Sequence, residues 1–213
     1  MAFLTTTFPV GVLSCNCTII ADDESKSAII VDPGGDAGEI LKWCGSRGLA
    51  ISLLVHTHGH FDHILAAAEL RQATGAPIAL HENDRWLYEN VDVQGRMFGM
   101  QLKSLGTFDF TLDHEQVHQC GAVALKTIFT PGHTPGSVCF HVEKEKLLLS
   151  GDTLFAGGIG RTDLWGGNHD AIMKSIDERL LCLDESTVIV PGHGSKTTLQ
   201  HELENNPFLM DLA

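Results

Sequence analysis

Four side chains that can bind a metal ion lie within six consecutive positions of the chain. They are His58, His60, Asp62 and His63, and they follow a strongly apolar stretch that ends at Val55. Side chains two positions apart in an extended segment point to the same side, so His58 and His60 can reach one metal ion. Asp62 and His63 open an expected helix and point in a different direction. This spacing predicts two neighbouring metal sites.

An ordinary histidine-rich loop, or a group of histidines satisfied inside the core, is the alternative interpretation of this segment. Four groups of ligand type so close together would leave polar groups unpaired in a folded interior unless something binds them. A metal is the simpler explanation. Gly59, which lies between two of the histidines, is expected to let the backbone turn tightly.

Three further candidate ligands lie later in the chain, and each directly follows a glycine: His133, Asp152 and His193. A single His or Asp behind a glycine is more often part of a turn than a ligand. All three, however, end apolar stretches that are expected to be strands, as the central cluster does. One edge of a pair of sheets could therefore gather all seven side chains.

The elements that must position these residues are indicated by the hydrophobic pattern. Eight apolar runs predict strands, at residues 17–21, 28–32, 51–56, 77–80, 123–129, 137–142, 147–150 and 187–191. Helical periodicity marks residues 36–47, 62–74 and 168–183, the last with Asn168 as its expected N-cap. Residues 91–121 show no clear period and are expected to form loop and irregular strand. Strands with interspersed helices favour a layered α/β architecture with helices outside the sheets.

The order and context of these ligands resemble the metallo-β-lactamase superfamily over essentially the whole chain. Within that superfamily the sequence is most similar to the short glyoxalase-II-type thioesterases, at residues 151–163 and at Asn206-Pro207-Phe208. The resemblance implies an αββα sandwich with the metal site at one edge of the two sheets. It assigns three ligands to each ion and one to both: His58, His60 and His133; Asp62, His63 and His193; and Asp152 as the bridge.

The same resemblance implies a metal-dependent hydrolase that cleaves S-lactoylglutathione-type thioesters through a metal-bound hydroxide. Two divalent ions are expected, with zinc first and iron or manganese as alternatives. Metals lower the pKa of bound water to about 7, so no serine or cysteine nucleophile is needed. Asp62 is the expected catalytic residue because it can orient the hydroxide while holding its metal.

Contacts to the substrate are expected from Arg161 and Lys196, although both could be surface charges or members of structural ion pairs. Asp32 ends a predicted strand and could orient a ligand histidine through a hydrogen bond, or it could only shape the following turn. Thr57 and Thr134 are similar candidates. Only 20 residues follow His193, so we expect one domain over residues 1–213 and no C-terminal helical region of the kind that grips glutathione in longer enzymes.

A persulfide dioxygenase is the chief rival, because members of this superfamily with that activity share the Gly-Arg-Thr-Asp type of segment found at residues 160–163. Such an enzyme would need one iron, which His58, His133 and Asp152 could hold, and it would act on glutathione persulfide. A structural metal site is disfavoured by the mixture of carboxylates and histidines. The glycines of residues 157–160 lack the Lys-Ser/Thr of a phosphate-binding loop.

Composition narrows the partners. A formal net charge of −13 with only 14 Lys and Arg disfavours nucleic acid and membrane surfaces, which leaves a small-molecule thioester, with a glutathione conjugate as the first candidate. The six cysteines are too sparse for a disulfide framework, and the start of the chain lacks a basic and apolar export signal, so a cytoplasmic protein is expected. Cys15 and Cys17 are expected to be buried in a strand. The pattern makes no prediction of oligomeric state.

Overall fold

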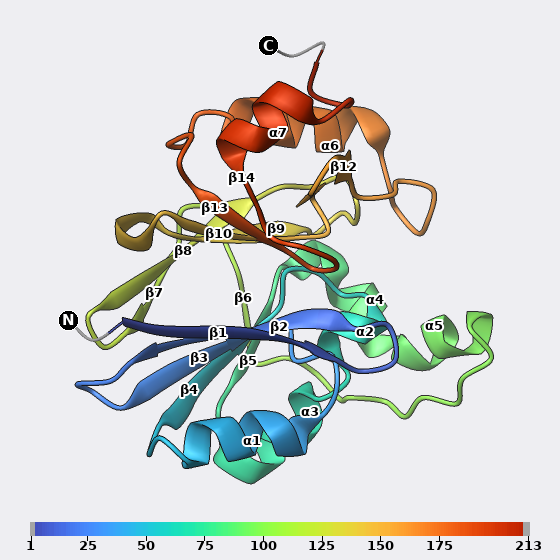
Figure 1. The fold of residues 1–213 in the computed structure, drawn as a ribbon. Helices are drawn as coiled ribbons and strands as arrows, with labels where there is room; N and C mark the ends of the chain where they lie inside the picture. The colour runs from blue at the N-terminus through green and yellow to red at the C-terminus, as the bar shows by residue number, and fades with distance from the viewer. Residues whose placement is uncertain (1–2, 211–213) are drawn as a thin grey trace.

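Two six-stranded sheets that pack face to face form the centre of the molecule (Figure 1), in a computed structural model that describes residues 3–210. The first sheet has the spatial order β1 (Phe3–Val10), β2 (Cys15–Asp22), β3 (Ser27–Val31), β4 (Ala50–Val55), β5 (Ile78–Leu80) and β6 (Phe110–Thr111). The second has the order β14 (Thr197–Thr198), β13 (Val188–Pro191), β10 (Leu147–Gly151), β9 (Val138–Val142), β8 (Val123–Phe129) and β7 (Val117–Cys120). A separate hairpin joins β11 (Leu154–Phe155) and β12 (Gly158–Ile159).

Helices lie on both outer faces of this pair of sheets. The α-helices are α1 (Ala37–Gly45), α2 (Phe61–Ile64), α3 (Ala67–Thr74), α4 (Arg85–Glu89), α5 (Val91–Met97), α6 (His169–Ser175) and α7 (Leu199–Asn205). Two 3₁₀ turns (Glu82–Asp84 and Glu143–Glu145) and one π-helical turn (Ile176–Leu180) complete the elements. Helices α1 and α3 cover the first sheet, and α6 and α7 cover the second (Figure 1).

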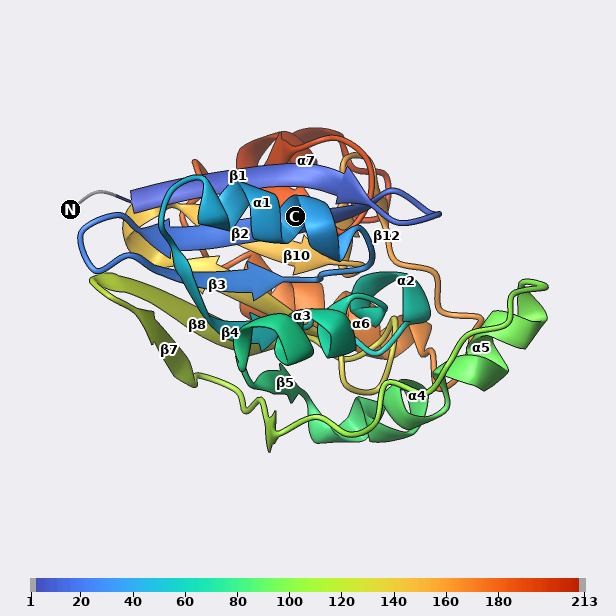
Figure 2. The ribbon, with the colours of Figure 1, turned by 90° about the horizontal axis from the view of Figure 1, so that it is seen from below.

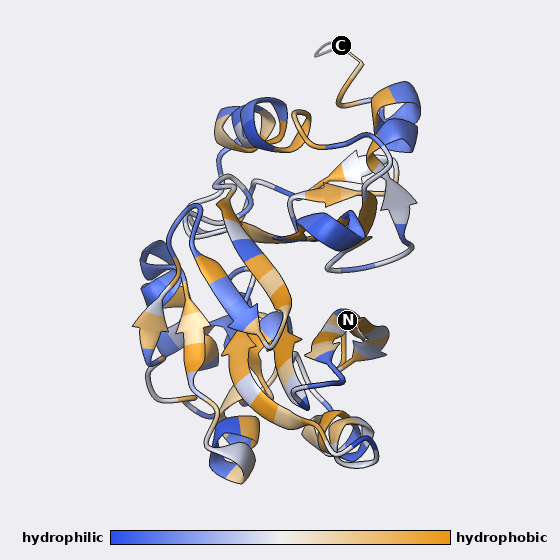
Figure 3. Ribbon diagram, turned by 90° about the vertical axis from the view of Figure 1, so that its left-hand side faces the viewer, coloured by the Kyte–Doolittle hydropathy of each residue, from blue (hydrophilic) through white to orange (hydrophobic). Residues whose placement is uncertain are grey.

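Alternation along the strands creates three apolar layers. In β2, Ile19 faces the helices of the first sheet, whereas Ile20 faces the second sheet and joins a cluster with Phe140. In β10, Leu149 faces inward and Leu148 packs outward under α6 and α7. Successive side chains of a strand point to opposite faces, so strands covered on both sides must be apolar throughout. In Figure 3 the strands of the two sheets are coloured largely as hydrophobic residues. The expected αββα sandwich is confirmed.

Strand direction places the functional loops at one edge. Strands β3, β4 and β5 run parallel to one another. In the second sheet β10 and β13 are parallel, and β8 shares their direction because both β8 and β10 are antiparallel to β9. The carboxyl ends of parallel strands meet at the same edge of a sheet. The loops that follow these strands therefore converge.

All eight predicted strands are present, with ends shifted by at most two residues. Cys15 and Cys17 are fully buried in β2, as expected, and all six cysteines are free. The prediction omitted β1, whose run of threonines and Pro9 is a weak strand signal. Proline is tolerated there because β1 is an edge strand.

The helix predictions need three corrections. The helix expected at 62–74 is interrupted between α2 and α3, because the amide of Ala66 donates to the Pro33 carbonyl at 2.9 Å. The helix expected at 168–183 starts as predicted at its Asn168 cap but ends in a π-helical turn. The irregular structure expected from residue 91 is wrong, because α5 forms there. Gly95 interrupts the hydrophobic pattern of α5 in the sequence. A larger residue would not fit there, because a Cβ would lie 2.6 Å from Cγ of Leu102.

Within residues 3–210, no helix combines the length and apolar character that crossing a bilayer requires.

Candidate metal centre

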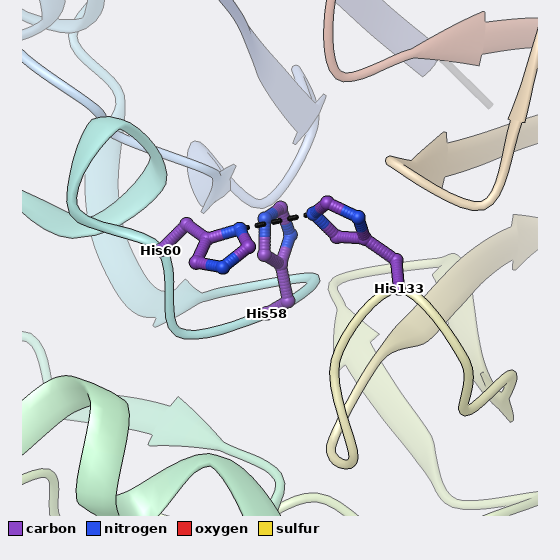
Figure 4. Close-up of side chains that lie close together, drawn as sticks. All are labelled: His58, His60 and His133. Atoms are coloured by element: carbon purple, nitrogen blue, oxygen red, sulfur yellow. Dashed lines mark hydrogen bonds between the residues drawn. The ribbon is translucent and has the colours of Figure 1, made fainter. Parts of the chain in front are cut away.

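Three histidines from two loops form the first group of donors. His58 and His60 lie between β4 and α2, and His133 lies in the loop after β8. Nδ1 of His60 is 2.9 Å from Nε2 of His133, and one nitrogen of each ring lies within 4.8 Å of the others. Figure 4 shows the three rings converging from the two loops. The facing ring nitrogens of His60 and His133 are as close as they would be if both bound one ion.

Asp62, His63 and His193 form the second group. Oδ2 of Asp62 is 3.0 Å from Nε2 of His193 and 3.6 Å from Nε2 of His63. The two ring nitrogens are 3.2 Å apart. Asp62 and His63 belong to α2, whereas His193 follows β13. The helix that starts at Phe61 turns these two side chains away from the direction of His58 and His60.

Asp152 lies between the two groups. Its Oδ1 is 3.6 Å from Nε2 of His63 in the second group, and its Oδ2 is 3.6 Å from Nε2 of His133 in the first. It follows β10, so it reaches the centre from the second sheet. The structure thus brings all seven predicted ligands together, with Asp152 in a bridging position.

The donors fit a pair of divalent ions. Nε2 of His58, Nε2 of His60 and Oδ1 of Asp152 are buried without a hydrogen-bond partner among the described residues. Such atoms are costly to bury unless something binds them. Ligands about 2.0–2.2 Å from one zinc ion lie roughly 3–4 Å from each other, which matches the separations measured here. Imidazole and carboxylate donors suit zinc, iron or manganese.

The protonation states of His58, His60 and Asp62 favour metal binding. Burial lowers the pKa of His58 well below its ordinary value and that of His60 to about 3. Both rings are therefore neutral at pH 7, which is the form that binds a metal. Burial alone would raise the pKa of Asp62, but the neighbouring rings of His63 and His193 hold it well below the ordinary value. Asp62 is ionised as a ligand must be.

Asp32 holds the histidines of the first loop in place. Its Oδ2 lies 3.0 Å from Nδ1 of His63, and its carboxylate accepts hydrogen bonds from the Thr57 amide and hydroxyl, both at 2.7 Å. The Thr57 hydroxyl in turn lies 3.1 Å from Nδ1 of His58. These contacts leave Nε2 of each ring to face the centre, so Asp32 does more than shape a turn. Behind His63, burial raises the pKa of the Cys15 thiol to about 12, and its sulfur lies 3.4 Å from Nδ1 of His63.

Asp84 is a buried carboxylate that the sequence interpretation missed. It accepts hydrogen bonds from the Gly59 amide at 2.8 Å, the Thr134 hydroxyl at 2.7 Å and the Gly136 amide at 2.6 Å. It therefore ties the loop of His58 and His60 to the loop of His133. Burial raises its pKa to about 6, although these donors favour the ionised form. The only signal in the sequence was its place shortly after the apolar run at 77–80.

Gln94 is a further residue that the sequence interpretation missed, and Gly59 has a different role from the one expected. The Gln94 side chain accepts from the Phe61 amide at 3.0 Å and donates to the Gly59 and Leu87 carbonyls at 2.9 and 2.8 Å, so α5 supports the first loop. Nothing in the sequence singled it out. Gly59 was expected to allow a tight turn, but its φ is not positive. Glycine is required at position 59 because there is no room for a side chain: a Cβ there would lie 2.8 Å from Cβ of Leu87.

A cleft of about 160 Å³, partly open to solvent, exposes the donors. Besides five of the seven predicted ligands, its lining comprises Leu13, Phe61, Gln94, Phe98, Arg161, Leu164 and Trp165. Arg161 is at the cleft, as predicted, and its carbonyl accepts from Nδ1 of His133 at 2.7 Å. Lys196 is not in this lining. It borders a separate hollow with Thr198 and His201, so its position does not support the predicted substrate contact.

Comparison with known proteins agrees with this geometry. Residues 10–193 match the family model of the metallo-beta-lactamase superfamily. The chain is 39% identical to the probable metallo-hydrolase YqgX of Bacillus subtilis, covering 94% of this chain and 95% of that protein. It is 38% identical to the hydroxyacylglutathione hydrolase GloC of Haemophilus influenzae, with the same coverage.

Two solved structures superpose closely. The BLEG-1 B3 metallo-beta-lactamase has a TM-score of 0.90 at 36% identity and covers 97% of this chain and 99% of its own. TTHA1623 in a di-iron-bound form has a TM-score of 0.87 at 34% identity and covers 96% and 100%. The family match over residues 10–193 includes all seven predicted ligands. This chain belongs to the metallo-β-lactamase superfamily.

Proposed function

We propose that this metal-dependent hydrolase is a thioesterase acting on S-lactoylglutathione-type thioesters. The observation that carries the proposal is the pair of donor groups joined by Asp152 and open to one cleft. The named activity of the GloC relative supports the choice of a glutathione thioester. Hydrolysis adds water across the bond between the carbonyl carbon and sulfur, and it releases an acid and a thiol.

The protein groups divide the work between holding and orienting. His58, His60 and His133 would hold one ion, and Asp62, His63 and His193 the other. Ions bound there would make water acidic enough to supply hydroxide at neutral pH and would stabilise negative charge on the carbonyl oxygen. Asp62 lines the cleft, so its carboxylate can accept a hydrogen bond from the attacking water and direct its lone pair toward the thioester carbon.

The experiment is a substrate panel on protein loaded separately with zinc, iron and manganese, with metal content quantified for each sample. Thiol release from S-lactoylglutathione is the expected result, and a chromogenic cephalosporin serves as the comparison substrate because of the likeness to BLEG-1. Cephalosporin cleavage without thioester cleavage would make the chain a β-lactamase. No thiol release from any fully loaded sample would refute a thioesterase.

A persulfide dioxygenase needs only one iron. The complete second group of Asp62, His63 and His193 supports the hydrolase, because it could hold the second ion that a two-metal hydrolysis uses. Oxygen uptake with glutathione persulfide, at one iron per chain and without thioester cleavage, would reverse this choice.

A further inference from the structure

One side of the cleft above the metal donors is an apolar wall, made by Leu13, Phe98, Leu164 and Trp165. These residues come from three separate segments: the turn between β1 and β2, the end of α5, and the loop between β12 and α6. The Trp165 ring lies 6.4 Å from the His60 ring, centroid to centroid. The wall therefore begins directly beside the proposed ligands.

The wall is exposed far more than apolar side chains normally are. Leu13 is 45% exposed and Phe98 50% exposed. Their neighbours Val12 and Met97 are exposed too, and Trp86, also exposed, lies 6.3 Å from the Trp165 ring. These residues are half of the large exposed hydrophobics within residues 3–210. Helix α5, which carries Met97 at its end, projects beyond the sheets (Figure 2). Exposed apolar side chains gathered at a cleft in this way are typical of a binding site.

The polar residues of the cleft offer little to a charged substrate. Arg161 is the single Lys or Arg among the described residues that line it. Its guanidinium is paired with the Asp163 carboxylate through hydrogen bonds of 2.7 and 2.8 Å. Both ends of the Gln94 amide are bonded to the backbone. The lining therefore offers no unpaired Lys or Arg to the carboxylates of a peptide thiol. It does offer apolar side chains against which an apolar group can pack.

We propose that the natural thioester carries an apolar group directly beside the scissile bond, and that Trp165 and Phe98 select it. This inference rests on the proposed thioesterase reaction and refines its substrate class: S-lactoylglutathione is cleaved, but a thioester with an apolar group is preferred. Lactoyl is small and hydroxylated, so it would leave the wall wet. Each methylene that the wall removes from water is worth roughly fourfold in affinity, so an acyl or thiol group of several carbons gains much more than a lactoyl group.

The test compares two series of thioesters on the metal-loaded protein. The first keeps glutathione and varies the acyl group through acetyl, lactoyl, hexanoyl and phenylacetyl. The second keeps acetyl and replaces glutathione with hexanethiol. We expect kcat/KM to rise at least tenfold from acetyl to hexanoyl if the wall takes the acyl group, or from glutathione to hexanethiol if it takes the thiol.

Variants of the wall identify the residues responsible. Trp165→Ala and Phe98→Ala should each lower the apolar-to-acetyl ratio of kcat/KM at least threefold, and Trp165→Phe should lower it less. Trp43→Ala is the matched control, because Trp43 lies on α1 under Arg47 and lines a different groove. It should leave the ratio and the activity unchanged.

The outcomes separate this inference from the function it rests on. Thioester cleavage with the same kcat/KM for acetyl, lactoyl and hexanoyl, and with no rise from glutathione to hexanethiol, overturns the apolar substrate class and leaves the thioesterase standing. The absence of cleavage in every series overturns both. A Phe98→Ala variant that changes the oligomeric state in size-exclusion chromatography, with an unchanged ratio, shows that the wall contacts a second copy and also overturns the inference.

Discussion

The two sheets supply their metal donors in different ways. The first sheet contributes His58, His60, Asp62 and His63 from a single loop and helix start after β4. The second contributes His133, Asp152 and His193 one at a time, each after a different strand. A compact cluster can be found in a sequence, whereas three single residues acquire meaning only when their strands are known to share a direction.

The two regions also differ in what holds them. Side chains support the first loop: Asp32 contacts His63, and Gln94 bonds to the backbone on either side of His60. In the second region, Nδ1 of His133 meets a backbone carbonyl, that of Arg161. The first loop should therefore be the more sensitive of the two to substitution of its supporting residues.

The largest effect is expected in the first region, at Asp62. Asp62→Ala removes a carboxylate that both faces the cleft and holds metal, so kcat should fall roughly 10²- to 10⁴-fold, the range for losing a group that handles the transferred proton. Thiol release is measured at matched, quantified metal content. Asp23→Ala, in an exposed ion pair with Lys26, is the control and should keep wild-type turnover. Near-normal turnover in a fully metallated Asp62→Ala protein would remove Asp62 from the mechanism.

Asp84 connects the two regions, and its loss should be the largest effect on stability. Asp84→Ala leaves the buried donors of Gly59, Gly136 and Thr134 without their acceptor, which should cost about 3 kcal/mol in free energy of unfolding. Urea unfolding measures this, with metal removed from all samples. The control is Asp92→Ala, in an exposed pair with Arg96, which should cost less than about 1 kcal/mol. Equal stability of the two variants would mean that Asp84 does not join the loops.

Asp32 tests the difference in support directly. Asp32→Asn weakens the hold on His63 and Thr57, so metal affinity should drop about 10- to 100-fold, as is usual when such a partner is changed. Arg161→Ala is the counterpart in the second region, and it should keep metal affinity because His133 is held by the backbone carbonyl. Competition with a chromophoric chelator measures both. A larger loss of metal affinity in Arg161→Ala than in Asp32→Asn would show that the second region is the more sensitive one.

Local patterns were enough to predict eight of the strands, a layered α/β architecture and the seven candidate ligands, whereas the αββα sandwich was implied by the resemblance to a known superfamily. These predictions depend on the alternation of apolar and polar residues and on which residues follow the strand ends. Both can be read directly from the sequence. The interruption of the helix before Ala66 was not visible, because it depends on the Pro33 carbonyl from another loop. Asp84 and Gln94 were missed for the same reason. Their partners, which are backbone groups and the Thr134 hydroxyl, are brought near only in the folded chain.

The smallest expected effect concerns the second sheet away from the metal donors. His118 of β7 is buried, with Nε2 3.1 Å from the Thr127 hydroxyl, and burial lowers its pKa below the ordinary value of about 6.5. On acidification the unfolded chain takes up the proton first, so this histidine's contribution to stability is present above pH 6.5 and is lost as the pH falls through the folded-state pKa.

His118→Gln should therefore make the free energy of unfolding less dependent on pH between 7.5 and 5.5 than it is in the wild-type protein. Urea unfolding in excess chelator measures this difference without interference from bound metal. Gln200→Ala, on exposed α7, is a control that should keep the wild-type slope. An unchanged slope in His118→Gln would show that His118 does not contribute to the acid sensitivity and that other buried histidines, such as His56 and His141, carry it.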